Sequence, residues 1–495
     1  MKTIPEMFSS VAKQHAKRAA VVDGGKVILY EILEKRIRTL ALKLYRMGIR
    51  QGDRIALLLP NGLDFVTGYF GIAAVGAIVV PMNDHYQQTE LLYFLDECGV
   101  SLLITSKNFA PLCDQVLSMR KSPCQLFWAE DLPEPFESES LSSDDFKVDI
   151  DPEAPVMYQF SSGSTGRPKR IGRTHTNLLF ELDSLIRTLR ITHEDRFLGA
   201  APFSHVNGLM RSMMASLRAG ATLYPLARFD RQVVAETIEK NRISIFIGVP
   251  FMPSILAKSH FRRRPDFSSL RLCVTASAPM PKKLNQQFYE NFGIYVRQLY
   301  GSTETGTISV NLSPDIERSL DSVGTPLAGI EVEIFTDEGR IVNAGEIGEL
   351  AVKSKATIKG YDGLDEVNKE VFRGGYFFTG DLGKRDEEGL LYLVGRKKFF
   401  INRGGYKIDP HEIEEILESH PGVEEAVAIG VPTPFGDEKV KAVIVSKGPC
   451  TEEEIVEYCR GKIADFKIPS LVEFRDSLPK SPTGKIRRTM LISES

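Results

Sequence analysis

Apolar and polar positions in the N-terminal third of the chain follow helical and strand periods in turn. Four apolar residues recur at intervals of three or four positions, which places them on one face of a helix that Gly48 is expected to end. They are Leu33, Ile37, Leu40 and Leu44. The segments that follow predict, in order, a buried strand at 55–59, a helix at 64–75, a strand at 77–81, a helix at 89–98 and a strand at 101–105. This β-α-β-α-β order is typical of a parallel sheet that helices cover on both faces.

The pattern weakens and then changes character further along the chain. Residues 107–150 are irregular and include an acidic, serine-rich part at 138–146, which predicts an exposed loop before the pattern resumes near Val156. After about Val394 a basic, glycine-rich stretch leads into helices at 411–419 and 451–463 and strands at 423–431, 440–446 and 471–475. We therefore expect an α/β protein with two domains joined by a hinge. They are a large N-terminal domain of doubly wound sheets at 1–394 and a small α+β C-terminal domain at 395–495.

Composition and charge narrow the class of protein. Of the 495 residues, 42% are hydrophobic and 26% are charged, as in ordinary globular proteins. The net charge of −3 provides no general attraction to nucleic acid or to an anionic membrane surface. No apolar run is long enough to span a membrane, the N-terminus lacks the apolar core of a secretory signal, and the six cysteines form no CxxC pair. We expect a soluble, cytoplasmic protein with no nucleic-acid partner, no integral membrane association and cysteines that remain thiols.

The stretch SSGSTGRPK, residues 161–169, is the first candidate for chemistry. It follows the apolar segment VMYQF and precedes a basic segment and a helix that starts near Thr176. Its glycines allow backbone N–H groups to face an anion, its hydroxyls add donors and Lys169 adds positive charge. The spacing differs from GxxxxGK[ST], so an ordinary P-loop is disfavoured. Taken by itself, such a stretch is also compatible with a flexible surface loop.

Three further motifs follow in the second half of the chain. YGSTETG, residues 300–306, offers an aromatic face, a hydroxyl and a carboxylate, which suit a base, a phosphate and Mg²⁺. YFFTGDLG places Asp381 in a tight turn, where a carboxylate can accept two ribose hydroxyls, and GRKK follows with Arg396. PKSPTGKIRR places Lys485 on a glycine-bearing loop. Each motif alone is also compatible with a charged turn.

The order and spacing of these motifs, together with GRKKFFINRGGYKI, resemble the adenylate-forming superfamily of acyl-CoA synthetases, carrier-protein-loading adenylation domains and luciferases. The resemblance runs from the helix at Ile32 to Lys485 and is greatest to acyl-CoA synthetases. It implies that ATP and Mg²⁺ convert a carboxylic acid to an acyl-adenylate with release of pyrophosphate, and that a thiol then accepts the acyl group. The adenylation step develops charge on phosphates, so it depends mainly on positioning and electrostatic stabilisation.

The resemblance also implies a role for individual residues. For the nucleotide, Thr165 and Lys169 belong to the phosphate loop, Tyr300 stacks on adenine, Thr303 meets the α-phosphate, and Asp381 and Arg396 bind the ribose. Glu304 holds Mg²⁺, and Lys485 bridges the carboxylate and the α-phosphate. Lys398 is the hinge, and Gly404 and Gly405 line the thiol tunnel. The expected catalytic residues are Thr165, His205, Glu304 and Lys485. The residues expected to bind ATP or the thiol cofactor are Ser161, Ser162, Gly163, Ser164, Thr165, Gly166, Lys169, Ser277, Ala278, Pro279, Tyr300, Gly301, Thr303, Glu304, Asp381, Arg396, Lys398, Gly404, Gly405, Lys407 and Lys485.

The segment APFSHVNGLM, residues 201–210, resembles the motif beside the family's carboxylate pocket. Relatives that activate amino acids have an aspartate at the position of His205, where it pairs with the α-ammonium group. An imidazole there would leave that cation without its partner, which predicts an acid without an α-amine. The expected pocket residues are His205, Val249, Pro250, Phe251, Ala276 and Ser277, mostly apolar or small, and they suit an aliphatic or aryl acid.

The acceptor thiol is predicted from the length of the chain. Because the sequence ends at Ser495, without room for a fused carrier domain, we expect an acyl-CoA synthetase that uses CoA. The alternative is a freestanding ligase that loads the phosphopantetheine of a separate acyl or peptidyl carrier protein. A nucleotide-binding protein without catalysis is disfavoured because Glu304, Asp381 and Lys485 are all present. No residue points to a luciferase-like oxidative step.

Overall fold

The computed structural model describes residues 1–132, 148–161, 169–399, 401–403, 406–408, 410–432, 438–460, 462–463, 465–480 and 486–493. The described residues form two compact units: a large unit (1–161, 169–331 and 352–377) and a small unit (332–351 and the described residues from 378 onward). Residues 332–351 and 378–394 thus group with the small unit, whereas the sequence places them in the first domain. The predicted boundary at 394 and the hinge near Lys398 remain predictions.

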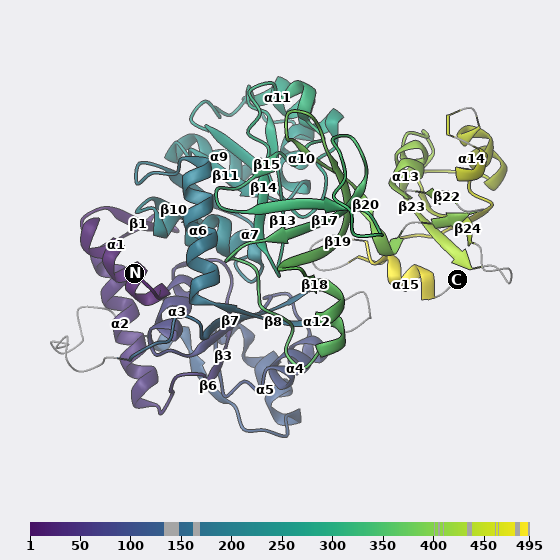
Figure 1. Cartoon of the computed structure of the whole chain (residues 1–495). Coiled ribbons are helices and arrows are strands. Elements are labelled where there is room, and N and C mark those ends of the chain that lie inside the picture. The colour runs from purple at the N-terminus through teal and green to yellow at the C-terminus, as the bar shows by residue number, and fades with distance from the viewer. Residues whose placement is uncertain are drawn as a thin grey trace. The chain divides into compact units, whose positions relative to one another are not determined.

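A six-stranded sheet carries the first part of the large unit, in the order β6-β5-β3-β4-β7-β8 (Figure 1). Its pairs are parallel except for the hairpin of β7 and β8. The strands are β3 (Arg54–Leu58), β4 (Ile78–Pro81), β5 (Leu102–Thr105), β6 (Gln125–Trp128), β7 (Pro155–Ser161) and β8 (Lys169–Thr174). Helices α2 (Tyr30–Arg46), α3 (Leu63–Ala74) and α4 (Gln88–Glu97) alternate with them, and the apolar face of α4 packs on Ala56, Leu58 and Val80. The predicted β-α-β-α-β order is confirmed.

A nine-stranded sheet carries the rest of the large unit, in the order β15-β14-β13-β12-β11-β9-β10-β1-β2. The central strands β9 (Arg196–Gly199), β11 (Ile245–Gly248), β12 (Leu272–Thr275) and β13 (Val296–Ser302) are mutually parallel neighbours. Antiparallel strands β14 (Gly306–Val310) and β15 (Thr325–Pro326) extend one edge, and β10 (Thr222–Pro225), β1 (Ala19–Asp23) and β2 (Lys26–Leu29) extend the other. Helices α6 (His175–Leu189), α9 (Arg231–Asn241), α10 (Phe251–Lys258) and α11 (Lys282–Phe292) come from the same part of the chain.

The small unit is of the α+β type. Strands β23 (Val423–Pro432), β24 (Glu438–Ser446) and β25 (Leu471–Phe474) form a three-stranded sheet, whose buried side chains pack with those of α13 (Pro410–Glu418) and α14 (Glu452–Cys459). Strands β16 (Glu331–Phe335), β17 (Gly348–Lys353), β19 (Tyr376–Arg385) and β20 (Leu391–Arg396) pair in a further sheet. The predicted α/β class, with a large N-terminal and a small C-terminal part, is confirmed.

Residues 107–150 are more regular than the sequence predicts. They contain helix α5 (Ala110–Met119) and strand β6, which pairs with β5 through Leu103 and Ile104. The helix is short and begins with a proline in its first turn, so its apolar period spans too few residues to stand out. The predicted loop at 138–146 lies outside the described residues. Helix α14 ends at Cys459, four residues before the predicted end at 463.

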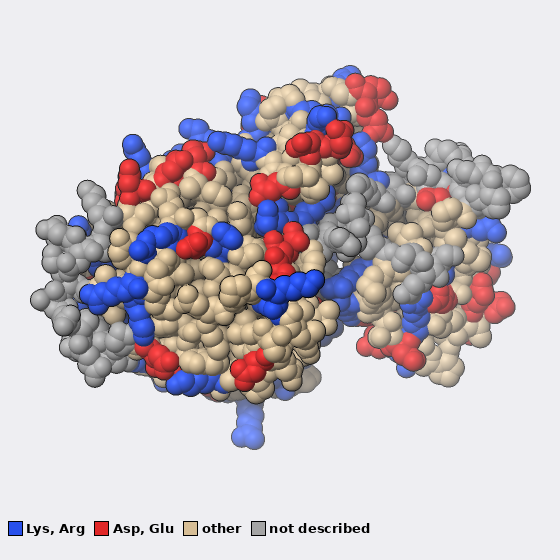
Figure 2. Space-filling view, turned by 90° about the horizontal axis from the view of Figure 1, so that it is seen from below, with Lys and Arg blue, Asp and Glu red and all other residues tan. Residues whose placement is uncertain are grey.

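The surface and the cysteines agree with the composition. Lysine and arginine side chains are interspersed with aspartate and glutamate on the face drawn in Figure 2. All six cysteines are free thiols, and Cys98, Cys113, Cys273 and Cys459 are buried. Among the described residues, no helix has the length and the apolar character that a membrane crossing requires.

Candidate active site

The carboxyl ends of four neighbouring parallel strands bring the predicted acyl and adenine residues to one edge of the nine-stranded sheet. Strand β9 leads into 200–205, β11 into Val249 and Pro250, β12 into Ala276 and Ser277, and β13 ends in Tyr300–Ser302. Ligands of α/β sheets bind at this edge, because the loops there can vary while the strands hold them in place. Ser277 has a left-handed backbone (φ 83°), a conformation that non-glycine residues adopt rarely and that is concentrated at functional sites.

The turn between β13 and β14 presents the predicted metal ligand. Glu304 is only 8% exposed, and its Oε1 accepts a hydrogen bond of 2.9 Å from the hydroxyl of Tyr361. Tyr361 is held by its own packing against Ile171 and Ile358. No described residue donates to the other carboxylate oxygen of Glu304, so one hard oxygen ligand is available. A single carboxylate oxygen fits Mg²⁺, which commonly takes one or two carboxylates and completes its shell with water and phosphate.

Lys169, at the start of β8, lies beside the same tyrosine. Its ammonium nitrogen stands 4.7 Å from the centre of the Tyr361 ring, a cation–π distance. No described carboxylate lies within ion-pair distance of this ammonium group. Tyr361 therefore contacts both a carboxylate suited to a metal and a cation suited to a phosphate.

A buried ionic network supports the turn. Arg173, fully buried on β8, donates from one Nη to the carbonyl of Thr303 (3.1 Å) and from the other to Glu181 Oε2 (2.9 Å). Glu181 lies in α6, and its Oε1 accepts from both the backbone N–H and the hydroxyl of Thr307, each at 2.9 Å. Gly306 is required there, because its φ is +71° and a Cβ at this position would lie 2.3 Å from Glu181 Oε2. Arg173 Nε has no hydrogen-bond partner among the described residues, but the remaining bonds fix the shape of the turn, and loss of one ionic partner would leave a buried charge unpaired.

A second buried arginine connects this turn to the acyl motif. Arg211 is 3% exposed; its Nε donates to Thr307 Oγ1 (2.9 Å) and its Nη1 to Asn207 Oδ1 (3.2 Å). Asn207 in turn donates to the carbonyl of Gly248 (2.7 Å), immediately before Val249. Burial lowers the pKa of Arg211 to about 10, so the guanidinium remains charged at neutral pH.

His205 is in contact with a buried asparagine that follows β4. Asn83 Nδ2 lies 3.3 Å from His205 Nε2, and Asn83 Oδ1 accepts the backbone N–H of His85 at 2.9 Å. The second bond fixes which way the amide faces, because the reverse orientation would oppose two donors. Nδ2 therefore donates and His205 Nε2 accepts, which assigns the proton of a neutral imidazole to Nδ1.

The predicted pocket wall is uneven in its exposure. Ala276 is buried and Val249 and Pro250 are partly buried, but Phe251 is 47% exposed and its ring packs edge-on against Phe229 at 5.5 Å between centroids. Of the residues that follow β12, Ser277, Ala278 and Pro279 are exposed. The assignment of these residues to the acyl pocket remains a prediction.

The small unit holds the predicted ribose pair. Asp381 and Arg396 are directly opposite each other on β19 and β20, and Arg396 Nε donates to Asp381 Oδ1 at 2.8 Å. Lys398 lies in the 3₁₀ turn Lys397–Phe399, and Lys407 lies in β22 (Tyr406–Ile408). Ser162, Gly163, Ser164, Thr165, Gly166, Gly404, Gly405 and Lys485 lie outside the described residues. For Ser161, Lys398 and Lys407 only the backbone is described.

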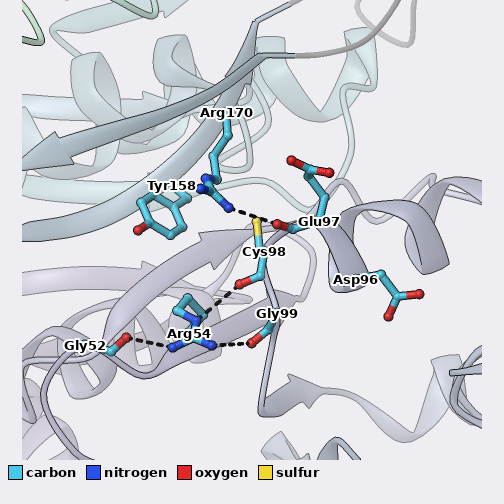
Figure 3. Close-up of a pocket in the computed structure, with 8 residues that line it drawn as sticks. All are labelled: Gly52, Arg54, Asp96, Glu97, Cys98, Gly99, Tyr158 and Arg170. Atoms are coloured by element: carbon cyan, nitrogen blue, oxygen red, sulfur yellow. Dashed lines mark hydrogen bonds between the residues drawn. The ribbon is translucent and has the colours of Figure 1, made fainter. Parts of the chain in front are cut away.

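A cavity whose lining includes none of these residues lies beside the hairpin of β7 and β8 (Figure 3). It has a volume of about 420 Å³ and is lined by Gly52, Arg54, Asp96, Glu97, Cys98, Gly99, Tyr158 and Arg170. Arg54 donates to the carbonyls of Cys98 (3.2 Å) and Gly99 (3.0 Å), and Arg170 donates to that of Glu97 (2.9 Å). These arginines therefore cap the carboxyl end of α4, and Arg170 anchors the strand that follows the predicted phosphate loop.

Sequence reasoning missed Asn83, Arg173, Glu181, Arg211 and Tyr361. One signal was present for two of them, a single charged residue within an apolar run: Arg211 in GLMRSMM and Glu181 in LLFEL. A lone charge in such a run indicates a buried and paired group. Arg173 lies in the basic segment KRIGR, where one more charge does not stand out. Asn83 and Tyr361 lie in ordinary loop sequence, which carries no such signal.

Comparisons with known proteins match the chain to one enzyme family. Residues 8–362 match the sequence profile of the AMP-binding enzyme family, and residues 412–485 match that of the AMP-binding enzyme C-terminal domain. A long-chain-fatty-acid–CoA ligase of Escherichia coli is 30% identical over 532 aligned positions, which cover 100% of this chain and 95% of the relative. A feruloyl-CoA synthase of Amycolatopsis is 33% identical over 481 aligned positions, which cover 96% of this chain and 95% of the relative.

Solved structures agree with these relatives. The o-succinylbenzoate CoA synthetase of Bacillus subtilis, in complex with its acyl-adenylate intermediate, superimposes with a TM-score of 0.88 at 28% identity and covers 98% of both chains. The same protein in complex with ATP and magnesium ion has a TM-score of 0.86 at the same identity and coverage.

Proposed function

The chain belongs to the AMP-binding enzyme family of adenylate-forming acid–thiol ligases, as its motifs predict, and on that premise we propose that it is an acyl-CoA synthetase for an acid without an α-amine. ATP, Mg²⁺ and a carboxylic acid would give an acyl-adenylate and pyrophosphate, and CoA would then take the acyl group and release AMP. The observation that carries the proposal is the arrangement around Tyr361, where one hydroxyl holds Glu304 and the ring faces the ammonium group of Lys169.

This arrangement suits a magnesium–triphosphate. The available oxygen of Glu304 would ligate Mg²⁺, whose charge offsets that of the phosphate oxygens. Lys169 would pair with a phosphate, because no described carboxylate already neutralises it. Thr303, whose carbonyl is fixed by Arg173, would direct its side chain to the α-phosphate. The relative solved with ATP and magnesium ion supports this cofactor choice.

The pairing of Asn83 with His205 supports the substrate class. A neutral imidazole whose Nε2 already accepts from Asn83 provides no negative charge for an α-ammonium group. An amino acid would therefore leave a cation without a partner, at a cost typical of an unpaired charged group. The named substrates of the relatives, a long-chain fatty acid and ferulic acid, both lack an α-amine and favour an aliphatic or an aryl acid here.

The test is a panel of acids scored for pyrophosphate release with ATP and Mg²⁺. We would compare straight-chain acids, 4-hydroxycinnamic acids and matched α-amino acids, each with CoA and with a pantetheinylated carrier protein. Release of AMP and pyrophosphate with CoA consumption supports the proposal. Formation of ADP and phosphate would contradict it, and a strong preference for the carrier protein would establish the alternative ligase.

A matched pair of variants ties the activity to the proposed metal ligand. Glu304→Gln removes the charge and keeps the shape, and it should lower pyrophosphate release about 10²-fold or more, by analogy with loss of a single electrostatic group at a reacting centre. Glu317 also accepts a tyrosine hydroxyl, from Tyr295 at 2.7 Å, but it is exposed and outside the site. Glu317→Gln should retain activity within about twofold, as expected of a surface substitution.

A further inference from the structure

We propose that Arg211 is a positioning residue that couples binding of the acid to binding of the nucleotide. The inference rests on the proposed function, because it concerns how the two halves of that site are held in register. The guanidinium group of Arg211 donates hydrogen bonds toward both halves of the site. Nε reaches Thr307, directly after the YGSTETG turn, and Nη1 reaches Asn207, inside the acyl motif.

Each end of this bridge continues into the proposed binding surface. On the nucleotide side, Thr307 shares Glu181 with Arg173, and Arg173 holds the carbonyl of Thr303. On the acyl side, Asn207 holds the carbonyl of Gly248, next to the predicted pocket wall. Arg211 and the side chains that it connects are at most 6% exposed, so water competes poorly for the bonds between them. These side chains are Asn207, Thr307, Glu181 and Arg173.

The backbone at Arg211 is itself unusual. Residues Leu209–Met214 form a π-helix, and all six are buried. Such helices are rare, occur mostly as single turns within α-helices and are frequent at functional sites. Here the wider turn contains Arg211. This backbone feature does not depend on the side-chain hydrogen bonds of Arg211.

The bridge would couple the two ligands because residues ordered by the nucleotide also hold the wall of the acyl pocket. A nucleotide that orders the turn also orders Thr307, and through Arg211 it fixes Asn207 and Gly248 before the acid binds. The acid then binds to a wall that is already in place, and its carboxylate meets the α-phosphate without further adjustment. Coupling of this kind typically changes affinity by about 5- to 150-fold.

The experiment measures binding of the acid with and without α,β-methylene ATP and Mg²⁺ by calorimetry. The acid is whichever of decanoate and ferulate supports the faster pyrophosphate exchange. In the wild type, the nucleotide should tighten acid binding at least tenfold. In Arg211→Met this factor should fall close to one, while the affinity of each ligand alone stays within about threefold.

Two further variants test whether the coupling depends on the two hydrogen bonds of Arg211, and not on its charge or on a loss of folding. Arg211→Lys keeps the charge but cannot reach both acceptors, so it should also lose most of the coupling. Asn207→Asp keeps an acceptor for Arg211 and removes the donor to Gly248, and it should lower the factor even if Arg211→Met folds poorly. Arg297, a partly buried arginine that donates to the carbonyls of Asn311 and Ser313, provides the control, since Arg297→Met should leave the factor unchanged.

The outcomes distinguish the inference from the function on which it rests. A wild-type enzyme that binds neither the nucleotide nor any acid refutes both. A wild type that binds both without coupling, or an Arg211→Met or Arg211→Lys variant with the wild-type factor, overturns the inference alone. A loss of coupling in Arg297→Met as large as in Arg211→Met would also overturn the inference, because loss of an arginine outside the bridge would then have the same effect.

Discussion

Replacement of Tyr361 by phenylalanine isolates one hydrogen bond of the proposed metal site. The change removes the hydroxyl that donates to Glu304 Oε1 at 2.9 Å and retains the ring that faces Lys169. The phenyl ring also retains the packing on Ile171 and Ile358, so the fold of this region should be unaffected. Any change in metal dependence can then be assigned to the carboxylate.

The size of the effect follows from the burial of that carboxylate. A hydrogen bond to a charged group contributes about 1.5–3 kcal/mol, and Glu304 is only 8% exposed, so water replaces the lost donor poorly. Loss of an outer partner of a metal ligand typically lowers metal affinity or activity by about 10- to 100-fold, equivalent to roughly 1.4–2.8 kcal/mol. The two magnitudes agree, and we expect the Mg²⁺ concentration for half-maximal activity to rise by about 10- to 100-fold.

The assay is pyrophosphate release at saturating acid and ATP with Mg²⁺ varied. The KM for the acid should change less than about twofold, because the hydroxyl donates to the proposed metal ligand. Tyr295→Phe breaks the other tyrosine–glutamate bond described above and should leave the Mg²⁺ dependence as in the wild type. An unchanged or a lower half-maximal Mg²⁺ concentration in Tyr361→Phe would refute the role of this hydroxyl in holding a metal ligand.

The remaining predictions concern the half-reactions, the substrate class and acid stability. Lys485→Ala should slow adenylation by about 10²–10³-fold and still convert supplied acyl-adenylate to thioester, whereas Gly405→Leu should do the reverse; equal damage to both steps in both variants would contradict the division. In the wild type an acid should be preferred to its α-amino analogue by about a hundredfold or more, and His205→Asp should reduce that ratio at least tenfold; equal turnover of both by the wild type would contradict it. Burial lowers the pKa of His175 from its ordinary 6.5 to about 4, so the unfolded chain takes up a proton that the folded chain excludes between these values. The free energy of unfolding should therefore fall by up to about 3 kcal/mol as pH drops from about 6.5 to about 4, and His175→Gln should flatten this slope in denaturant titrations; an equally steep slope in the variant would refute it.

The fold could be predicted from the sequence where a single helix or strand contained enough apolar residues to show its own periodicity. The strands β3, β4 and β5 are short apolar runs with helices between them, so local pattern was sufficient to assign a parallel sheet. The same local pattern failed at α5 and β6, where a ten-residue helix with a proline in its first turn and a strand with a single buried residue give too little apolar pattern to detect.

The candidate site was predictable only as far as motifs reach. Glu304 and Lys169 were identified by their place in recognised turns, but their common neighbour Tyr361 is 57 residues from Glu304. Glu181 and Thr307 are separated by 126 residues, and nothing in either local sequence names the other. The second contact depends on how α6 packs against β8 of one sheet and β14 of the other, which no single segment encodes.

The position of Glu181 also has a consequence for the order in which the enzyme matures. Its carboxylate ties β8 of the six-stranded sheet to β14 of the nine-stranded sheet through Arg173 and Thr307. The chain between these strands is long, so this contact has a high contact order and is expected to close after each sheet has largely formed. A refolding molecule would then show native secondary structure before it can turn over substrate, and return of activity would report the last step of assembly. Substitutions at Glu181 would accordingly lengthen the interval between those two events more than they change the early formation of helices and strands.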